Sequence, residues 1–233
     1  AFNFFKKKND LVENHYGQNI NENYFINYVN QRIEFFKNFK IGSWKNYSKN
    51  EYRDPIFLIG FPRSGTTLLD TVLRTNTSVD VIEEKPILKN FLIKLEKKTK
   101  NDFNNLNTLD EEFIDQMKNF YFQEQKKYQK NKSTKIVIDK LPLNIIHVGE
   151  ILRFFPNAKF VFALRHPYDS VLSCFMQQFI LNPAMKNFLS IESSAFLYDL
   201  VMKLWTIYRE TFSINFHIIK YEDIVSNFEK TTK

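Results

Sequence analysis

The sequence predicts an α/β fold in which a central parallel β-sheet lies between two layers of helices, forming a three-layer sandwich. Two observations lead to this prediction. Short apolar runs with the character of buried strands alternate along the chain with longer segments whose apolar residues recur at helical spacing. The first of these runs leads through a glycine-bearing loop directly into a helix, an arrangement that binds phosphate groups.

The N-terminal part of the chain precedes the predicted sheet. Residues 20–40 carry apolar side chains at helical spacing and predict an amphipathic helix. Residues 42–50 are polar and irregular, which is typical of a linker. We therefore divide the chain into an N-terminal helical segment, residues 1–50, and a compact domain, residues 51–233. The segment is either a linker or the remnant of a preceding helical domain.

Four short apolar runs predict the strands of the sheet. Residues 56–59 form a continuous apolar run that Gly60 closes, as expected of a strand covered on both faces. The other predicted strands are residues 136–138, 159–164 and 215–219. Helices are predicted between and after them. They cover residues 66–73, 109–130, 143–155, a helix that begins at Pro167, residues 192–212 and a helix from Glu222 onward.

Length and charge limit the classes of function. The 233 residues suit one domain of an α/β enzyme with a flanking segment. A net charge of +7 favours anionic partners, but the positive residues are not gathered in one arm. No helix-turn-helix, zinc or RNP signature supports nucleic-acid binding, so we predict no nucleic-acid partner. A small polyanion held in one pocket also suits this charge.

Cysteine content and targeting signals indicate the compartment. The single cysteine, Cys174, lies in an apolar run, which indicates a small buried side chain rather than a nucleophile, and no internal disulfide can form. No apolar stretch is long enough for a membrane span. The chain begins with apolar residues before charged ones, the reverse of a signal peptide, and we predict a cytoplasmic protein. Ala1 in place of methionine is typical of a processed or excised piece.

The segment PIFLIGFPRSGTTLLDTVL combines a strand, a glycine-bearing loop and a helix. Backbone N–H groups of such a loop and the helix N-terminus converge on an anion, and the helix dipole adds to the attraction. Gly60 and Gly65 permit the tight backbone path, while the threonines supply hydroxyl groups. The segment therefore predicts a P-loop-type sandwich, with Arg63, Ser64, Gly65, Thr66 and Thr67 as the phosphate-binding residues.

This loop departs from the Walker A pattern at one position. Gly60, Gly65 and Thr67 fit the pattern, but Thr66 occupies the lysine position and the basic residue, Arg63, comes earlier. The departure argues against hydrolysis of ATP or GTP. A nucleotide or small-molecule kinase of the P-loop class remains the alternative function.

The sequence PRSGTT after an apolar strand resembles the 5′-phosphosulfate loop of sulfotransferases, which move a sulfuryl group from PAPS (3′-phosphoadenosine 5′-phosphosulfate) to a hydroxyl. Cytosolic members usually have lysine at the position of Arg63. The arginine form resembles the tyrosylprotein sulfotransferases and the bacterial sulfotransferases that carry tetratricopeptide repeats. The resemblance implies that Arg63 holds the bridging or sulfuryl oxygens, a role that suits its planar fork of donors.

A second strand–turn–helix segment, KFVFALRHPYDSVLSCF, ends its strand at Arg165 and places Ser173 eight residues later. These side chains can meet at the sheet edge where α/β proteins bind ligands. The spacing resembles the 3′-phosphate site of sulfotransferases, although Arg165 alone also suits a structural salt bridge. Near the end of the chain, YEDIV resembles a further family element. Tyr221 is then either a packing residue or a contact beside the adenine.

Sulfuryl transfer needs a base, cations to neutralise developing charge, and in-line geometry. Glu84 lies 21 residues after Arg63, which is the glutamate position of the tyrosylprotein-like branch, and its neighbour Glu83 is the alternative. Lys140 in DKLPLN stands where cytosolic sulfotransferases carry a catalytic histidine, and the resemblance implies that it binds the leaving oxygen. His147 lies in an apolar helical run and is the next candidate base.

The resemblance also sets expectations for cofactor and partners. PAPS is the donor, PAP the product, and no metal is expected because no cluster has ligand spacing. The acceptor hydroxyl belongs to a protein tyrosine, a glycan or a small molecule. The segment from PLN to HVG is similar to the repeat-bearing branch, so association with a helical repeat domain is expected. Residues 51–233 would be a sulfotransferase domain that is short at its C-terminal end, and a non-catalytic PAPS-binding module is a further alternative.

Overall fold

The structure is a computed structural model that describes residues 1–21, 23–40, 42, 44, 53–131, 134 and 136–231. Most of the predicted linker, residues 42–50, lies outside the described residues. In the part of the chain that is described, no helix has both the length and the apolar character that a membrane crossing requires.

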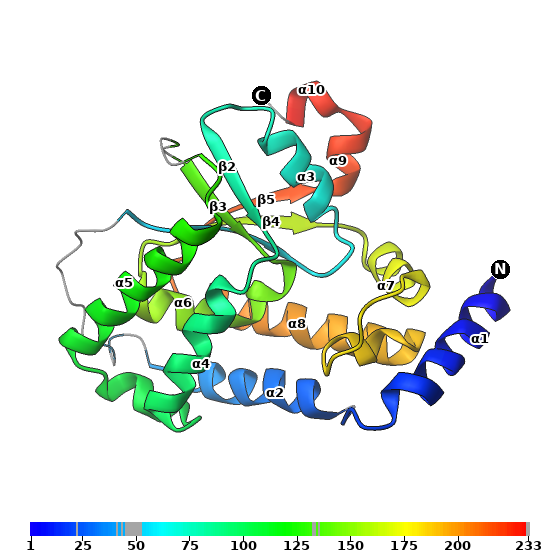
Figure 1. Cartoon of the computed structure of the whole chain (residues 1–233), viewed down its shortest axis with the longest axis horizontal. Coiled ribbons are helices and arrows are strands. Elements are labelled where there is room, and N and C mark those ends of the chain that lie inside the picture. The colour runs from blue at the N-terminus through cyan, green and yellow to red at the C-terminus, as the bar shows by residue number, and fades with distance from the viewer. Residues whose placement is uncertain are drawn as a thin grey trace.

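A five-stranded parallel sheet forms the centre of the molecule, as Figure 1 shows, and confirms the predicted α/β class. The strand order is β2-β3-β1-β4-β5. The strands are β1 (Ile56–Gly60), β2 (Val79–Glu83), β3 (Ile136–Lys140), β4 (Lys159–Leu164) and β5 (Asn215–Lys220). Strands β1, β3, β4 and β5 coincide with the four predicted runs, and β2 was not predicted.

The physical reason for missing β2 lies in its composition. The strand VDVIE carries two acidic residues, so it lacks the continuous apolar character of the other strands. The carboxylate of Asp80 is buried. Its Oδ2 accepts hydrogen bonds from the backbone N–H groups of Lys130 (2.8 Å) and Asn131 (3.3 Å). Tertiary hydrogen bonding therefore compensates a polar residue that the pattern alone disfavours.

Helices cover both faces of the sheet, as predicted. In β1 the side chains of Phe57 and Ile59 enter the larger core. This core also receives residues of α2 (Asn23–Lys37), α4 (Ile87–Thr99), α5 (Glu111–Tyr128), α6 (Val148–Phe154) and α8 (Ile191–Thr211). Leu58, on the opposite face, joins a smaller core with Leu69 of α3 (Thr66–Leu73) and Ile224 of α9 (Tyr221–Ser226). In Figure 1 the helices of these two layers lie on opposite sides of the strands. This alternation is what the period-two geometry of a strand requires.

The helices agree with the sequence prediction except in four places. Helices α1 and α4 were not predicted, and the expected helix at 143–155 begins as a 3₁₀ segment, η3 (Pro142–His147). The helix expected from Glu222 onward is divided into α9 and α10. Asp110 caps α5 by accepting a hydrogen bond from the Phe113 N–H at 2.7 Å. The α-helices are α1 (Phe2–Val12), α2 (Asn23–Lys37), α3 (Thr66–Leu73), α4 (Ile87–Thr99), α5 (Glu111–Tyr128), α6 (Val148–Phe154), α7 (Pro167–Met176), α8 (Ile191–Thr211), α9 (Tyr221–Ser226) and α10 (Phe228–Thr231). A π-helical segment, η1 (Glu13–Gly17), and two further 3₁₀ segments, η2 (Phe103–Thr108) and η4 (Met185–Phe188), complete the described elements.

Helix α2, the predicted amphipathic helix, packs into the larger core. Val29, Ile33 and Phe36 are buried there on one stripe of the helix. Arg32 is also buried and forms an ion pair with Glu150 of α6, with 2.6 Å between Nη2 and Oε1. The N-terminal segment thus contributes to the core of the sheet domain, and the division of the chain near residue 51 stays a prediction.

Candidate functional site

A cleft of about 390 Å³ opens at the edge of the sheet where the strands have their carboxyl ends. Every strand is followed by a residue that lines it: Arg63 after β1, Glu84 after β2, Leu141 after β3, Arg165 after β4 and Tyr221 after β5. Loops from all five strands meet here because the strands are parallel. This edge is therefore the candidate site.

The loop between β1 and α3 has the strained path of a phosphate loop. Arg63 and Gly65 both have positive φ, 68° and 92°, and the Ser64 N–H donates to the Phe61 carbonyl at 3.1 Å. A Cβ on Gly65 would lie 2.6 Å from the ring of Tyr221, and one on Gly60 would lie 2.6 Å from a backbone carbonyl of β4. Both glycines are thus needed for close approach, and Gly65 is also needed for its positive φ.

The hydroxyl residues of the loop divide into two groups. Thr66 and Thr67, at the N-terminus of α3, line the cleft. Ser64 is buried, and its Oγ points back toward Gly60 and has no hydrogen-bond partner among the described residues. A buried hydroxyl without a hydrogen-bond partner is uncommon. The Ser64 hydroxyl lies within the loop that would enclose a phosphate.

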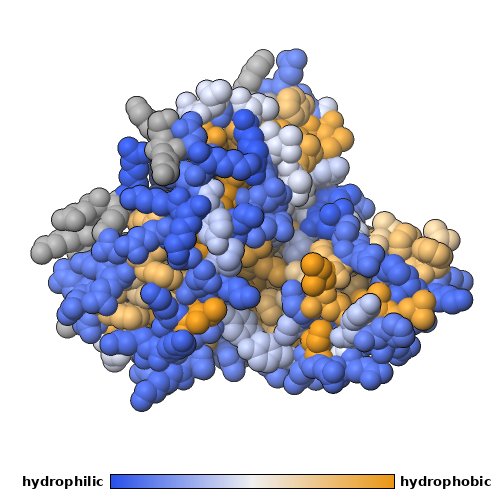
Figure 2. Space-filling model, viewed as in Figure 1, coloured by the Kyte–Doolittle hydropathy of each residue, from blue (hydrophilic) through white to orange (hydrophobic). Residues whose placement is uncertain are grey.

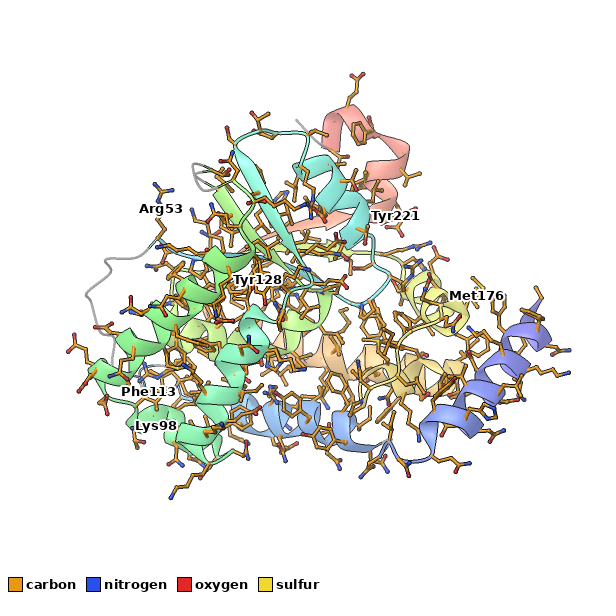
Figure 3. The ribbon with its side chains drawn as sticks, viewed as in Figure 1. Arg53, Lys98, Phe113, Tyr128, Met176 and Tyr221 are labelled. Atoms are coloured by element: carbon orange, nitrogen blue, oxygen red, sulfur yellow. The ribbon has the colours of Figure 1, made fainter. Side chains whose placement is uncertain are left out.

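Two arginines join this loop to the turn after β4. Arg63 Nε donates to Ser173 Oγ at 3.0 Å, and Arg165 Nη1 donates to the carbonyl of Arg63 at 3.4 Å. The Arg165 guanidinium lies over the ring of Tyr221, 4.5 Å from its centroid, and Figure 3 shows Tyr221 at the C-terminal end of β5 beside α3. Arg165 Nε is buried and, among the described residues, lacks a hydrogen bond; the carboxylate of Asp169 lies 3.9 Å away. The structure therefore brings the predicted Arg165 and Ser173 together through Arg63.

A lysine–carboxylate cluster lies at the ends of β2 and β3. The register pairs Glu83 with Lys140, and the Glu84 N–H donates to the Lys140 carbonyl at 2.7 Å. Lys140 is fully buried, and its Nζ lies 2.8 Å from Glu84 Oε1 and 3.0 Å from Glu83 Oε1. The hydrogen bond from Lys140 holds the pKa of Glu83 below its usual value. The ammonium is thus covered by two carboxylates rather than open to the cleft.

The two glutamates of this cluster face different neighbours. Glu84 lines the same cleft as Arg63 and Thr66 of the phosphate loop, and its backbone has a positive φ of 50°. Glu83 ends β2, and its Oε2 lies 3.7 Å from Arg74 Nη2 next to α3. Of the two glutamates that the sequence left as alternative bases, only Glu84 lines the cleft. The catalytic role of each stays a prediction.

Three further titratable residues lie outside the cleft. His147, the next candidate base in the sequence, packs 3.3 Å from both Arg32 and Glu150, and burial lowers its pKa. Cys174 is buried, its thiol donates to the Pro62 carbonyl, and burial raises its pKa to about 12, which disfavours a nucleophilic thiolate. Asp139 of β3 is fully buried and accepts a hydrogen bond from the Tyr121 hydroxyl at 3.1 Å.

Part of the cleft was not predicted. Its apolar lining includes Leu141, Pro142 and Leu143, which directly follow Lys140, and Phe179 and Met185, which come from the segment after α7. The first three could have been found from their position at the end of a predicted strand. The other two carry no motif, because the chain returns to the cleft only through the packing of η4 against α7 and α8.

Of the residues assigned from the sequence to phosphate binding or catalysis, Lys140, Ser64 and Ser173 contact the loops of the cleft without lining it. The residues that line it are Arg63, Gly65, Thr66, Thr67, Glu84, Arg165 and Tyr221. Within the described ranges, no three or more His, Cys, Asp or Glu side chains are grouped so that they could hold a metal. The site is thus a sheet-edge cleft that combines a lysine-free phosphate loop, two arginines and a buried lysine with two carboxylates. Together with the fold, it defines a phosphate-loop α/β protein.

Residues 55–233 match the Sulfotransferase family, and the chain therefore belongs to that family. An uncharacterized protein of Aquifex aeolicus (strain VF5) is 29% identical over 186 residues, which cover 77% of this chain. The same match covers only 24% of the Aquifex protein, so this chain spans about a quarter of that relative.

A solved sulfotransferase domain shares the fold. The sulfotransferase domain from the curacin biosynthetic pathway superposes with a TM-score of 0.51 at 21% identity, covering 77% of this chain and 71% of that domain. A sulfotransferase from Alicyclobacillus acidocaldarius gives a TM-score of 0.48 at 15% identity, covering 78% of each chain. The predicted family and fold class are confirmed.

Proposed function

We propose that this chain transfers a sulfuryl group from PAPS to an acceptor hydroxyl, without a metal. The observation that carries the proposal is the meeting, in one cleft, of the linked arginines Arg63 and Arg165 with the Glu84–Lys140 pair. The first pair suits two separate anionic groups on one ligand, and the second supplies a carboxylate beside them.

The residues present fit such a ligand. The Ser64 hydroxyl and Arg165 Nε, neither of which has a hydrogen-bond partner among the described residues, are polar atoms that a bound phosphate would satisfy. Loop residues 63–67 would hold the 5′-phosphosulfate, and Arg165 with Ser173 would hold the 3′-phosphate. Tyr221, stacked under the Arg165 guanidinium, would lie beside the adenine. When bound, PAPS supplies the activated sulfuryl group and leaves as PAP.

Glu84 is the proposed base. Its carboxylate lines the cleft and would accept the proton of the acceptor hydroxyl as that oxygen attacks. The ammonium of Lys140, 2.8 Å from Glu84 Oε1, keeps this carboxylate oriented and would add positive potential from its buried position. The guanidinium of Arg63, which lines the cleft, would neutralise the charge that develops on the leaving oxygen. These groups would stabilise the transition state more than the ground state, which is the condition for catalysis.

The test compares donors directly. Calorimetry with PAP, AMP and ATP should show a clear preference for PAP, and ³⁵S from labelled PAPS should appear in an acceptor with EDTA present. Equal affinity for PAP and ATP, or activity that returns only with Mg²⁺, would favour the kinase alternative. Tight PAP binding without turnover on any acceptor would favour a non-catalytic PAPS-binding module.

A further inference from the structure

The cleft has apolar lining residues besides its arginines. We call them the apolar wall: Leu141, Pro142 and Leu143 come from the start of η3, and Phe179 and Met185 from the segment after α7. Figure 2 shows apolar surface gathered in the hollow near the middle of the visible face, framed by hydrophilic residues. A cleft with one charged side and one apolar side separates the places for an anionic ligand and an apolar one.

The apolar wall begins beside the proposed base. Leu141 directly follows Lys140, whose Nζ lies 2.8 Å from Glu84 Oε1. Glu84, Leu141 and Leu143 all line the same cleft. A hydroxyl placed at the Glu84 carboxylate would therefore extend the body of its molecule along this wall.

The wall is supported by the core. The ring of Phe179 lies 5.2 Å from that of Phe188, and Phe188 in turn packs 5.7 Å from Phe61 at the start of the phosphate loop. Pro142 is buried. Met185 adds an unbranched thioether that adapts to the shape of a ligand. The wall is thus a preformed surface rather than an accidental exposure of apolar side chains.

The positive side chains near the wall are already engaged. Lys186, next to Met185, lies 2.8 Å from Glu13 Oε1 and donates to the carbonyls of Gly17 and Ile20. Lys85, next to Glu84, extends over the ring of Tyr128 of α5, which Figure 3 labels. Lys140 is covered by its two glutamates. Within the described part of the chain, an anionic acceptor would find no unengaged cation lining this side of the cleft.

Building on the proposed sulfuryl transfer, we infer that the acceptor is an uncharged alcohol or phenol with an apolar body that packs against Leu141, Leu143, Phe179 and Met185. An acidic peptide or an anionic glycan would place its charge against this wall and near the Glu84 carboxylate, where burial without a partner is costly. The two arginines do not relieve this cost because the donor occupies them.

A matched pair of phenols tests the inference. 4-Propylphenol and 3-(4-hydroxyphenyl)propionate share the reacting group and the chain length but differ by one negative charge. With PAPS as donor, kcat/KM for 4-propylphenol should exceed that for the propionate by at least about tenfold, the scale of small changes in an apolar pocket. An acidic peptide containing one tyrosine should be a still poorer acceptor.

Substitutions in the apolar wall should change KM for the phenol without changing PAP affinity, which a purely structural role would not do. Leu143→Asn, which keeps the side-chain size, should raise KM for 4-propylphenol about tenfold with PAP affinity unchanged. Ile180→Asn, at a side chain that is 93% exposed and does not line the cleft, is the matched control. Leu143→Lys should reverse the preference toward the propionate.

The outcomes distinguish this inference from the proposed function. Transfer to the propionate or the acidic peptide in preference to 4-propylphenol would overturn the apolar acceptor and leave sulfuryl transfer intact. If PAP binds but neither phenol reacts, calorimetry measures whether 4-propylphenol binds to the protein–PAP complex. Binding supports the apolar acceptor site, and the absence of binding at millimolar concentration overturns the inference. A protein that binds neither PAP nor PAPS would instead refute the proposed function.

Discussion

Lys140 Nζ lies within hydrogen-bond distance of both Glu84 and Glu83, yet only Glu84 lines the cleft. We therefore expect Glu84→Gln to lower kcat by about 10²–10⁴-fold, the usual effect of removing a general base, while PAP affinity hardly changes. Steady-state kinetics and calorimetry on the same preparation measure the two quantities.

Glu83→Gln is the internal control for this prediction. It removes a carboxylate that contacts the same ammonium but faces Arg74, so it should reduce kcat much less. A larger effect of Glu83→Gln than of Glu84→Gln would assign the base to the end of β2 instead.

Lys140→Met tests the role of the buried ammonium. The substitution removes the buried positive charge that holds Glu84 in place, and it should lower kcat by about 10²-fold or more, with a smaller loss of PAP affinity. It also removes the hydrogen bond that lowers the pKa of Glu83, so this pKa should rise toward its ordinary value. Carboxyl titration by NMR measures that change, and an unaltered Glu83 pKa would contradict the contact.

Lys85→Met is the matched control for this substitution. Lys85 follows Glu84 but extends over the Tyr128 ring and does not line the cleft. Its loss should leave kcat within about twofold, because a surface charge at this position has little effect on chemistry inside the cleft.

Arg165→Ala tests the 3′-phosphate site. Loss of one charge-assisted contact should weaken PAP binding by about 2–3 kcal/mol and leave AMP binding nearly unchanged, since AMP lacks the 3′-phosphate. Arg209→Ala, at an arginine of α8 whose guanidinium lies over Phe216, is the control and should not alter either affinity. Parallel weakening of PAP and AMP would indicate that Arg165 acts only by positioning the loop at Arg63.

Gly65→Ala separates backbone strain from steric conflict. At Gly65 an alanine meets a positive φ of 92° and places Cβ 2.6 Å from the Tyr221 ring, so we expect reduced stability and loss of PAP affinity. At Gly42 the φ is also 92°, but no atom of the described residues lies within 4 Å of an added Cβ. Gly42→Ala should therefore lower the free energy of unfolding only by the cost of the left-handed conformation, about 1–2 kcal/mol. Thermal unfolding and PAP titration of both variants check this difference, and equal effects on PAP affinity would argue against the contact with Tyr221.

The sequence predicted much of this site because its motifs stand directly after strands. In a parallel sheet the carboxyl ends share one edge, so Arg63, Glu84, Arg165 and Tyr221 converge once the strands are recognised. The pairing of Lys140 with the glutamates depends on the β2–β3 register, and β2 was hidden by its acidic residues. That lysine was therefore expected to be open to ligand and is instead buried.

The apolar wall marks the other limit of sequence reasoning. Phe179 and Met185 lie in a segment that has neither a clear period nor a motif, and only tertiary packing brings it to the cleft. Local patterns predict elements and the motifs at their ends, but not which irregular segment returns to cover a site. The acceptor side of the cleft is for this reason visible only in the structure.

The last prediction concerns stability and pH. Asp139 is fully buried beneath the site, and burial raises its pKa from 3.8 to about 7. Between these values the folded chain holds a proton that the unfolded chain has released, so the free energy of unfolding falls as pH rises. The slope is about 1.4 kcal/mol per pH unit, and the total loss is on the order of 4 kcal/mol at most. The stability that Asp139 contributes is fully present below about pH 4 and is lost once pH passes the pKa of the folded state, near 7.

Asp139→Asn isolates this group because the amide resembles the protonated carboxyl in size and polarity, and its side-chain oxygen can still accept from the Tyr121 hydroxyl. Urea unfolding of both proteins at pH 5, 6, 7 and 8 gives the difference in their free energies of unfolding. The variant should gain stability relative to the natural sequence as pH rises, because it has no carboxylate to ionise inside the core. A difference that stays constant from pH 5 to pH 8 would show that Asp139 ionises at its ordinary pKa and that the buried carboxyl is compensated by its surroundings.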